Sequence, residues 1–446
     1  MNIVDIIIKK RNGGKLDESE IRFFVEGVAR ATIQDYQISA LLMAIFFQGM
    51  DEEETATLTK EMAMTGDILS FPNIHDPIVD KHSSGGVGDK TSLVLAPIVA
   101  ACGLPIAKLS GRGLGFTGGT VDKLESFPGF RTELSEEEFS AFVERDGIAL
   151  MGQSADIAPA DKKLYALRDV TGTVDSIPLI AASIMSKKLA DGSDAIVLDV
   201  KCGSGAFMKT PQRAIELAGA MVSIGEANGK RTIALVTNMD QPLGEAVGNS
   251  LEVIEAINTL RGEGPADFTE ECYALAASML MAGERAKTQE EARELVRSVI
   301  EDGRAMEKLR CMVRNQGSDP AYVDDPNLFD KAALRVEGAA NRDGYVAAIN
   351  AEEIGKSSLL LGAGRLTTED VIDPAVGLLI HRKIGDFVKK GEALFTVCAN
   401  DEQKAQEAVQ KARAAYVIAD EPVETPSSPI IATVTRDGVQ MEANHA

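Results

Sequence analysis

Apolar residues in the first 66 positions recur at the spacing of amphipathic helices. In the segment LDESEIRFFVEGVARA, the side chains of Ile21, Phe24 and Val28 fall on one helical face. Asp17 and Glu20 precede this face in the spacing of a capping box. The segment YQISALLMAIFFQGM repeats the apolar pattern. This part of the chain therefore predicts a small helical domain.

After residue 78 short apolar runs alternate with helical stretches. The runs are PIAKLS (105–110), GIALMGQ (147–153), DAIVLDVKCG (194–203) and RTIALVTNMD (231–240). An amphipathic helix lies between the last two runs. Strand, helix and strand at this spacing predict right-handed crossovers and a largely parallel sheet.

The predicted fold class is α/β with three parts. A discontinuous all-helical domain comprises residues 1–66 and 160–192. A large mixed α/β domain with a mainly parallel sheet comprises 78–155 and 194–334. A C-terminal α+β portion follows at 335–446, where alternating strands are joined by Gly-Asp and Gly-Glu turns and the end of the chain predicts a surface loop and a last strand.

The net charge and the cysteine content exclude several classes of partner and site. The 446 residues carry a formal net charge of −22, which disfavours nucleic acid and anionic membranes as partners. An anionic substrate would therefore need a binding site with a locally positive electrostatic potential. The five cysteines are scattered without CxxC spacing, which indicates reduced thiols in a cytoplasmic protein and argues against a zinc site. No apolar run reaches the length of a membrane span.

Residues 81–92, KHSSGGVGDKTS, combine lysines, a histidine, glycines and hydroxyls. Neither a core strand nor a surface helix needs this mixture, so we interpret the stretch as a loop that holds a ligand. It lacks the GxxxxGK[ST] pattern of nucleotide P-loops and the strand and helix context of the dinucleotide fingerprint.

A second glycine-rich stretch, KLSGRGLGFTGGTVDKLE (108–125), directly follows a predicted strand. Glycines let backbone N–H groups approach a ligand, and hydroxyls and lysines suit an anion. Between residues 81 and 125 the chain has five basic and three acidic residues, a local balance of +2. The two stretches together predict a phosphate site.

A third stretch, DKKLYALRDVTGTVDSIPLIAASIMSKK, places Ser183 and Lys187 on one helical face, with Arg168 one segment earlier. The pattern alone leaves two interpretations open, surface residues or a second half of the site.

These stretches, together with DVKCGSGAFM, closely resemble the thymidine and pyrimidine nucleoside phosphorylases over nearly the whole chain. SIMSKKLADGSDAIVLDVK and VIDPAVGLLIHRKIGDFVKKGEAL resemble the broad-specificity pyrimidine branch. The resemblance implies a homodimer that converts a pyrimidine nucleoside (uridine, deoxyuridine or thymidine) and inorganic phosphate reversibly into free base and α-pentose 1-phosphate. It also implies closure of the domains, for which 66–80, 154–163 and 188–194 are the expected hinges.

The resemblance also implies three sets of site residues. The catalytic residues would be His82, Arg168 and Lys187. Phosphate would be bound by Lys81, His82, Ser83, Ser92, Lys108, Leu109, Ser110 and Thr120. The pyrimidine would be bound by Arg168, Ser183 and Lys187, with Tyr165 nearby, and a potassium ion by Gly88, Lys90, Leu243, Ala246 and Glu255. For His82 two roles stay open, a donor to the base carbonyl and a hydrogen bonder within the phosphate loop.

Two positions depart from the family pattern. Phe116 stands where the family usually has a histidine that bonds across the closing domains, so we expect weaker phosphate affinity or turnover here. Lys90 replaces a residue that is usually uncharged. Its ammonium would occupy or repel the potassium position, which predicts activity without potassium. The alternative is a solvated surface lysine.

Three other functions fit parts of the pattern. An anthranilate-type phosphoribosyltransferase shares a related fold but would need an acidic motif for magnesium pyrophosphate, and SGRGL argues the other way. A catalytically weak nucleoside- or phosphate-binding homologue fits the change at Phe116. A carrier domain at the C-terminus would need an exposed lysine at a hairpin turn, which is not evident.

Overall fold

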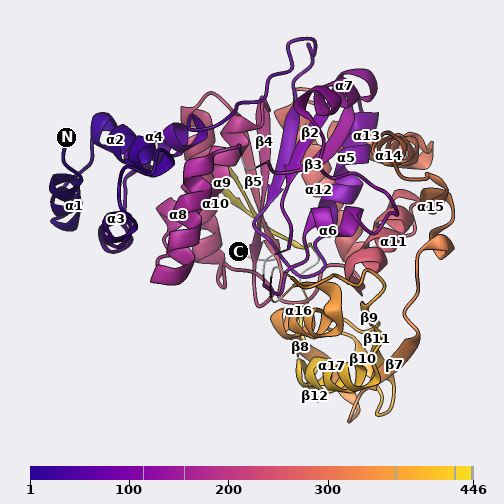
Figure 1. Cartoon of the computed structure of the whole chain (residues 1–446). Coiled ribbons are helices and arrows are strands. Elements are labelled where there is room, and N and C mark those ends of the chain that lie inside the picture. Colours follow the sequence, from indigo (N-terminus) through magenta and orange to yellow (C-terminus); the bar gives the residue numbers. More distant parts are fainter. Residues whose placement is uncertain (114, 155, 366, 368, 426–427, 443–446) are drawn as a thin grey trace.

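The computed structural model of the chain describes residues 1–442 except 114, 155, 366, 368, 426 and 427. Leu114 of the second glycine-rich stretch, Ala155 of the expected hinge at 154–163, and Pro426 and Ser427 of the predicted C-terminal loop lie outside the described residues. The chain forms a helical domain, a central sheet covered by helices, and a C-terminal α+β unit (Figure 1). The predicted fold class is confirmed.

The helical domain is built from two separate parts of the sequence. Asp17 caps its second helix through the predicted capping box with Glu20. Leu164 and Leu179, from the later part, pack in the same apolar core as the first four helices. This core makes the domain discontinuous. Its helices are α1 (Ile3–Arg11), α2 (Glu18–Ala29), α3 (Asp35–Gln48), α4 (Glu52–Ala63), α8 (Pro159–Thr171) and α9 (Ile177–Ala190).

The central sheet has the order β1-β4-β5-β13-β14. β1 (Val79–Ser83), β4 (Ala195–Cys202) and β5 (Arg231–Asn238) are parallel, as the crossover pattern predicts. The last two strands, β13 (Ile430–Thr435) and β14 (Gly438–Met441), extend this sheet with antiparallel pairing. Ile431 and Val434 share an apolar core with β4, β5 and α10 (Pro211–Ala227), so the end of the chain returns to the α/β domain.

A second, two-stranded parallel sheet lies beside β1. It consists of β2 (Ile106–Ser110) and β3 (Ile148–Gly152). The N–H of Val79, the first residue of β1, donates to the carbonyl of Pro105, just before β2, at 3.3 Å. Because parallel strands end at the same edge, the glycine-rich loops after β1 and β2 are neighbours. The other helices of this domain are α5 (Thr91–Ala101), α6 (Thr120–Leu124), α7 (Glu136–Asp146), α11 (Asn249–Leu260), α12 (Ala266–Ala282), α13 (Gln289–Glu301), α14 (Arg304–Asn315) and α15 (Ala321–Asp324), with a 3₁₀ turn at Pro326–Leu328.

The C-terminal unit packs below the sheet in Figure 1. Its strands form two antiparallel sheets, one of which includes β6 (Ala246–Val247) from the α/β domain. The elements are β7 (Leu334–Ala339), β8 (Gly344–Ile349), α16 (Ala351–Ser358) with a π turn at Leu359–Ala363, β9 (Gly377–Ile380), β10 (Phe387–Val388), β11 (Ala393–Ala399), α17 (Glu402–Ala414) and β12 (Tyr416–Ala419). In the part of the chain described here, no helix combines the length and apolarity needed to cross a bilayer.

Candidate active site

The stretch 81–92 begins within a strand of the sheet, so the expectation that no core strand needs its residues is wrong. Lys81 lies on β1 with 1% of its surface exposed. Its ammonium lies 2.8 Å from a carboxylate oxygen of Asp199 on β4 and donates to the Thr91 hydroxyl at 2.6 Å. A buried charge is tolerated when a carboxylate and a hydroxyl satisfy it in this way.

The loop after β1 is tied to the start of α5. The Ser83 hydroxyl donates to the carboxylate of Asp89, and that carboxylate accepts from the Thr91 hydroxyl at 2.6 Å. Ser92 follows in the first turn of α5 and is buried. The N-terminus of a helix favours an anion because its first N–H groups have no partner within the helix. The Thr91 N–H already donates to the Asp89 carboxylate at 3.3 Å, and the Ser92 N–H that follows it is suited to a phosphate oxygen.

Three predicted phosphate ligands lie at the end of β2. The Lys108 ammonium donates to the carbonyl of Lys81 at 2.5 Å and to the Asp80 carboxylate at 3.3 Å. Burial lowers the pKa of Lys108 to about 8, with Lys188 and Lys81 adding repulsion against the attraction of Asp80. The side chain of Leu109 belongs to an apolar core, so only its backbone can face a ligand. Ser110, the last residue of β2, is also buried.

The second glycine-rich loop folds back on itself before α6. A β-carbon on Gly119 would lie 2.1 Å from the backbone nitrogen of Gly113, so no larger residue fits there. The Gly113 N–H donates to the Asp122 carboxylate at 2.7 Å. This fold places Thr120 at the first position of α6.

The predicted local excess of positive charge is misleading. Each of the five basic residues between 81 and 125 has a carboxylate partner, and three of the partners lie far away in the sequence. Buried cations require such partners, so a count of the charges in one segment overestimates the positive electrostatic potential around it. The pairs are Lys81–Asp199, Lys90–Glu255, Lys108–Asp80, Arg112–Glu125 and Lys123–Glu252.

The predicted pyrimidine residues come from α8 and α9. Arg168 is 2% exposed, so its interpretation as a surface residue is wrong. Its guanidinium donates to three backbone carbonyls, those of Thr173 at 3.2 Å, Val174 at 2.7 Å and Leu179 at 2.9 Å. These bonds fix the plane of the guanidinium, which lies 5.9 Å from the ring centre of Tyr165.

Lys187 is held on α9 by a neighbour from α8. Its ammonium forms an ion pair with Asp161, which is 2% exposed, and donates to the carbonyl of Ser183 at 2.9 Å and to its hydroxyl at 3.3 Å. About a fifth of the Lys187 side chain, 23%, stays exposed. The structure thus brings Ser183 and Lys187 together as their spacing predicts.

Asp80 joins the two halves of the site. One of its oxygens accepts from Lys108 and the other accepts from Lys188 of α9 at 2.5 Å. Burial alone would raise the pKa of Asp80, but the two ammonium groups lower it to about 2. Because Lys188 directly follows Lys187, this carboxylate fixes to β1 the part of α9 that carries the predicted pyrimidine ligand Lys187.

His82 is neutral in this environment. Burial lowers the pKa of its imidazole well below 6.5, and repulsion from Lys188, Lys108 and Lys187 adds to the effect. A neutral imidazole donates a hydrogen bond without carrying a charge.

Comparison with known proteins identifies the domains of the chain. Residues 4–66 match the helical bundle domain of a glycosyl transferase family, and residues 75–306 match its α/β domain. Residues 345–419 match the pyrimidine nucleoside phosphorylase C-terminal domain. The pyrimidine-nucleoside phosphorylase of Geobacillus stearothermophilus is 53% identical over 427 residues, 96% of this chain and 98% of that protein. The enzyme of the same name from Bacillus subtilis is 55% identical over 402 residues, 90% of this chain and 93% of that protein.

The chain belongs to the pyrimidine-nucleoside phosphorylase family. It is therefore an enzyme of the pentosyltransferase class. A crystal structure of anthranilate phosphoribosyltransferase from Thermus thermophilus has the same fold at a TM-score of 0.57, covering 70% of this chain and 98% of that one. At 20% identity this likeness concerns the fold alone.

The five positions that the family resemblance assigns to potassium lie together, but an ammonium fills the space between them. The Lys90 nitrogen lies 2.5 Å from Glu255, and it donates to the carbonyls of Leu243 at 2.7 Å and Ala246 at 3.2 Å. Gly88 adjoins the same two carbonyls. Lys90 is 1% exposed, so its interpretation as a solvated surface lysine is wrong.

The site residues that were not predicted from the sequence are the buried partners of opposite charge. Asp80, Asp199 and Lys188 are fully buried, and Asp161 nearly so. A signal for two of them exists in the sequence. VDKHS is a strand of five residues with three ionisable ones, and IVLDVK carries two charges inside an otherwise apolar strand, which is uncommon unless a site requires it. Phe207 is an exposed aromatic residue beside the first glycine-rich stretch. It is 46% exposed beside Gly85, in the loop after β4.

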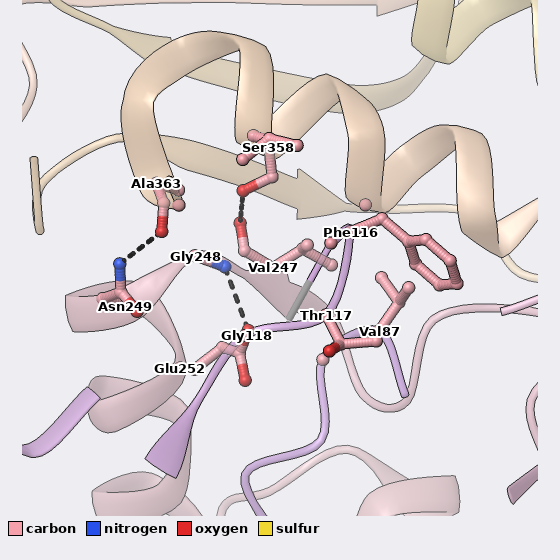
Figure 2. Close-up of a pocket in the computed structure, with 15 residues that line it drawn as sticks. Val87, Phe116, Thr117, Gly118, Val247, Gly248, Asn249, Glu252, Ser358 and Ala363 are labelled. Atoms are coloured by element: carbon pink, nitrogen blue, oxygen red, sulfur yellow. Dashed lines mark hydrogen bonds between the residues drawn. The ribbon is translucent and has the colours of Figure 1, made fainter. Parts of the chain in front are cut away.

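A small pocket lies behind the second glycine-rich loop (Figure 2). Asn249 donates to the carbonyl of Ala363 at 2.8 Å and Ser358 to that of Val247 at 3.4 Å, which joins α11 and β6 to the C-terminal unit. Among the described residues, none of the predicted phosphate ligands lines this pocket. The pocket is lined by Gly88 of the predicted potassium set and by Phe116, together with residues of the C-terminal unit such as Ser358.

Proposed function

We propose that this enzyme catalyses the reversible phosphorolysis of pyrimidine nucleosides, among them uridine, deoxyuridine and thymidine, to the free base and the α-pentose 1-phosphate. The observation that carries the proposal is the position of Asp80. Its two oxygens bond Lys108, on the phosphate half, and Lys188, beside the base-binding Lys187. In this proposal one buried carboxylate holds the residues that bind phosphate next to those that bind the base.

Phosphate binds at the ends of β1 and β2 in this proposal. It is surrounded by Lys108, by the hydroxyls of Ser92, Ser110 and Thr120, and by the Ser92 N–H at the start of α5. A phosphate oxygen forms a bond to the anomeric carbon while the bond from that carbon to the base nitrogen breaks, and the electron pair leaves with the base. Holding the two reactants in this geometry can remove about 7–11 kcal/mol of barrier.

The departing pyrimidine is stabilised from α8 and α9. Negative charge develops on the ring and its carbonyl oxygens as the bond to the sugar breaks. The guanidinium of Arg168 presents a planar pair of donors, and the ammonium of Lys187 presents a point charge. Both are held in place before the substrate arrives, by three carbonyls and by Asp161 respectively. Groups fixed in advance stabilise a transition state without reorganisation.

His82 contributes a hydrogen bond. Because burial and the neighbouring lysines lower the pKa of His82, its imidazole acts in this proposal as a neutral hydrogen-bond donor. It donates one N–H, either to the base carbonyl or to phosphate. No covalent nucleophile takes part, and the serine and threonine hydroxyls bind substrate.

The direct test is to incubate the protein with uridine and phosphate and to follow free uracil by chromatography. We expect uracil and ribose 1-phosphate in equal amounts, and no uracil when phosphate is omitted. Release of uracil without phosphate would indicate hydrolysis. No release at all would favour a nucleoside-binding homologue, and consumption of phosphoribosyl pyrophosphate with anthranilate would favour the phosphoribosyltransferase.

Phosphate binding should weaken at alkaline pH. Since Lys108 has a pKa of about 8, it is cationic below that value and neutral above it. We expect kcat/KM for phosphate to fall above pH 8, because this parameter reports ionisation in the free enzyme. A Lys108→Arg variant keeps its charge, so its profile should lack this decline. The ionisation of phosphate itself is common to both enzymes. An identical decline in both would contradict the assignment.

Phe116 should limit the use of phosphate. Its ring packs 6.2 Å from that of Phe207 and 5.8 Å from the ammonium of Lys209, and neither contact is a hydrogen bond. A Phe116→His variant gains a donor at this interdomain position. We expect KM for phosphate to fall or kcat to rise by about 2- to 10-fold, the effect of one hydrogen bond. Phe116→Leu is the apolar control. Equal or better kinetics in the parent enzyme would contradict this expectation.

We propose that two copies of the chain associate through the helical domain. Ile8, Tyr36, Phe47 and Val170 lie on its helices with 40% to 76% of their surface exposed. Large apolar side chains at such exposure support a protein interface. Light scattering should give twice the mass of the chain.

The five free cysteines, four of them buried, support a reducing compartment and hence the cytoplasm.

A further inference from the structure

Lys90 occupies a cage of oxygen atoms next to the phosphate loop. Its nitrogen has three oxygen neighbours within 3.2 Å, the carbonyls of Leu243 and Ala246 and the carboxylate of Glu255. The ring of Phe268 covers another side, with its centre 4.8 Å away. Burial opposes the charge, but Glu255 and Glu252 raise the pKa of Lys90, so the ammonium is charged.

We propose that the Lys90 ammonium is a built-in monovalent cation that fixes the phosphate loop in place of a diffusible potassium ion. Lys90 acts as a positioning residue, and phosphate binding is independent of potassium. The inference rests on the proposed function only in taking the loop after β1 as the phosphate site.

The cage does not fit a potassium ion in addition to the ammonium. A β-carbon on Gly244 would lie 2.8 Å from the Lys90 nitrogen and 2.0 Å from Glu255, so the surrounding backbone is already in close contact. One carboxylate and two carbonyls balance one charge. A second cation a few ångströms from the ammonium would be repelled in a buried site. The residues of the cage therefore bind the Lys90 ammonium instead of a potassium ion.

The cage lies where three parts of the structure meet. Lys90 precedes α5 and follows Asp89, which holds Ser83. The Leu243 N–H donates to the carbonyl of Val87 at 3.0 Å, which joins the cage to the first glycine-rich loop. From the C-terminal unit, Lys383 donates to the carbonyl of Gly244 at 2.7 Å. Loss of the Lys90 charge would therefore release the phosphate loop from the 243–246 segment.

The test compares the parent with a Lys90→Ser variant in potassium chloride and in choline chloride at equal ionic strength. The thermal unfolding temperature and the Kd for inorganic phosphate, by calorimetry, are measured in both salts. For the parent we expect the same values in both. For the variant in choline we expect a lower unfolding temperature and a Kd raised by about tenfold, with both recovered as potassium is added and less well with lithium.

Lys10→Ser is the matched control. Lys10 is also a buried lysine, 2.7 Å from Glu54 in the helical domain, and its loss should lower stability without recovery by potassium. A specific potassium effect on the parent would overturn the inference. So would a Lys90→Ser variant that binds phosphate like the parent in choline, or one that is weakened and not rescued.

If the variant does not fold in either salt, the comparison of the parent in the two salts decides. Neither readout requires turnover. A protein that binds phosphate but does not cleave uridine would overturn the proposed function and leave this inference intact.

Discussion

We expect Lys187→Gln to lower kcat for uridine phosphorolysis by about 10²- to 10³-fold, the usual effect of removing one group that stabilises charge in a transition state. The ammonium of Lys187 is fixed by Asp161 and Ser183 and is the part of this cluster that stays partly exposed to a substrate. Its charge matters most when the base departs, so kcat should fall more than KM rises. Steady-state kinetics at saturating phosphate measure both.

Two further measurements separate catalysis from folding. Lys187→Gln leaves Asp161 without its partner, so the double variant with Asp161→Asn should regain stability but not activity. Lys162→Gln, at an exposed position of the same helical pair, is the control and should behave like the parent. With 5-fluorouridine, whose base departs more easily, the loss should be smaller. An equal loss for both substrates would show that Lys187 does not act on the leaving base.

We expect Asp80→Asn to lower the free energy of unfolding by about 3–5 kcal/mol, because it leaves buried ammonium groups without their carboxylate. Lys108 and Lys188 both bond Asp80, and Asp191, 3.0 Å from Lys188, cannot replace it for Lys108. The pKa of Lys108 should fall further, which moves the alkaline decline of phosphate binding to lower pH. Denaturant titration measures the stability, and the pH profile measures the second effect.

The acid limb of stability gives an independent check on Asp80. Its pKa is lowered from 3.8 to about 2 on folding, so its stabilising effect is complete above the unfolded value and is lost as pH falls towards about 2. Asp35→Asn is the control, since Asp35 forms an exposed ion pair with Lys163 at 2.8 Å and should contribute at most about 1 kcal/mol. If the two variants lose equal stability, the buried network is not what joins β1 to α9.

Local patterns in the sequence predict much of this molecule. The spacing of apolar residues indicates the helical domain, because one buried face per helix imposes a period. Short continuous apolar runs indicate the parallel strands, which are buried on both faces. Ser183 and Lys187 share a face as their spacing requires. The anion site expected from the hydroxyls and lysines of the two glycine-rich stretches stays a prediction, because Lys81, Lys90 and Lys123 are also needed for buried ion pairs.

The interactions that could not be predicted from the sequence join residues that lie far apart along the chain. Lys81 pairs with Asp199 and Lys90 with Glu255, residues more than 100 positions away, so the balance of charge at the site cannot be read from one segment. The same holds for β13, which pairs with β5 although the segments between them form another unit. Strand pairing is set by tertiary packing, and a short alternating pattern does not specify its partner.

The most direct test of the account is a crystal structure of the parent enzyme with phosphate and uracil bound together. We predict phosphate against Lys108, Ser92, Ser110 and Thr120, and the uracil carbonyls against Arg168 and Lys187, with Asp80 still joining Lys108 to Lys188. Phosphate bound away from the two glycine-rich loops, or uracil bound away from α8 and α9, would contradict the account.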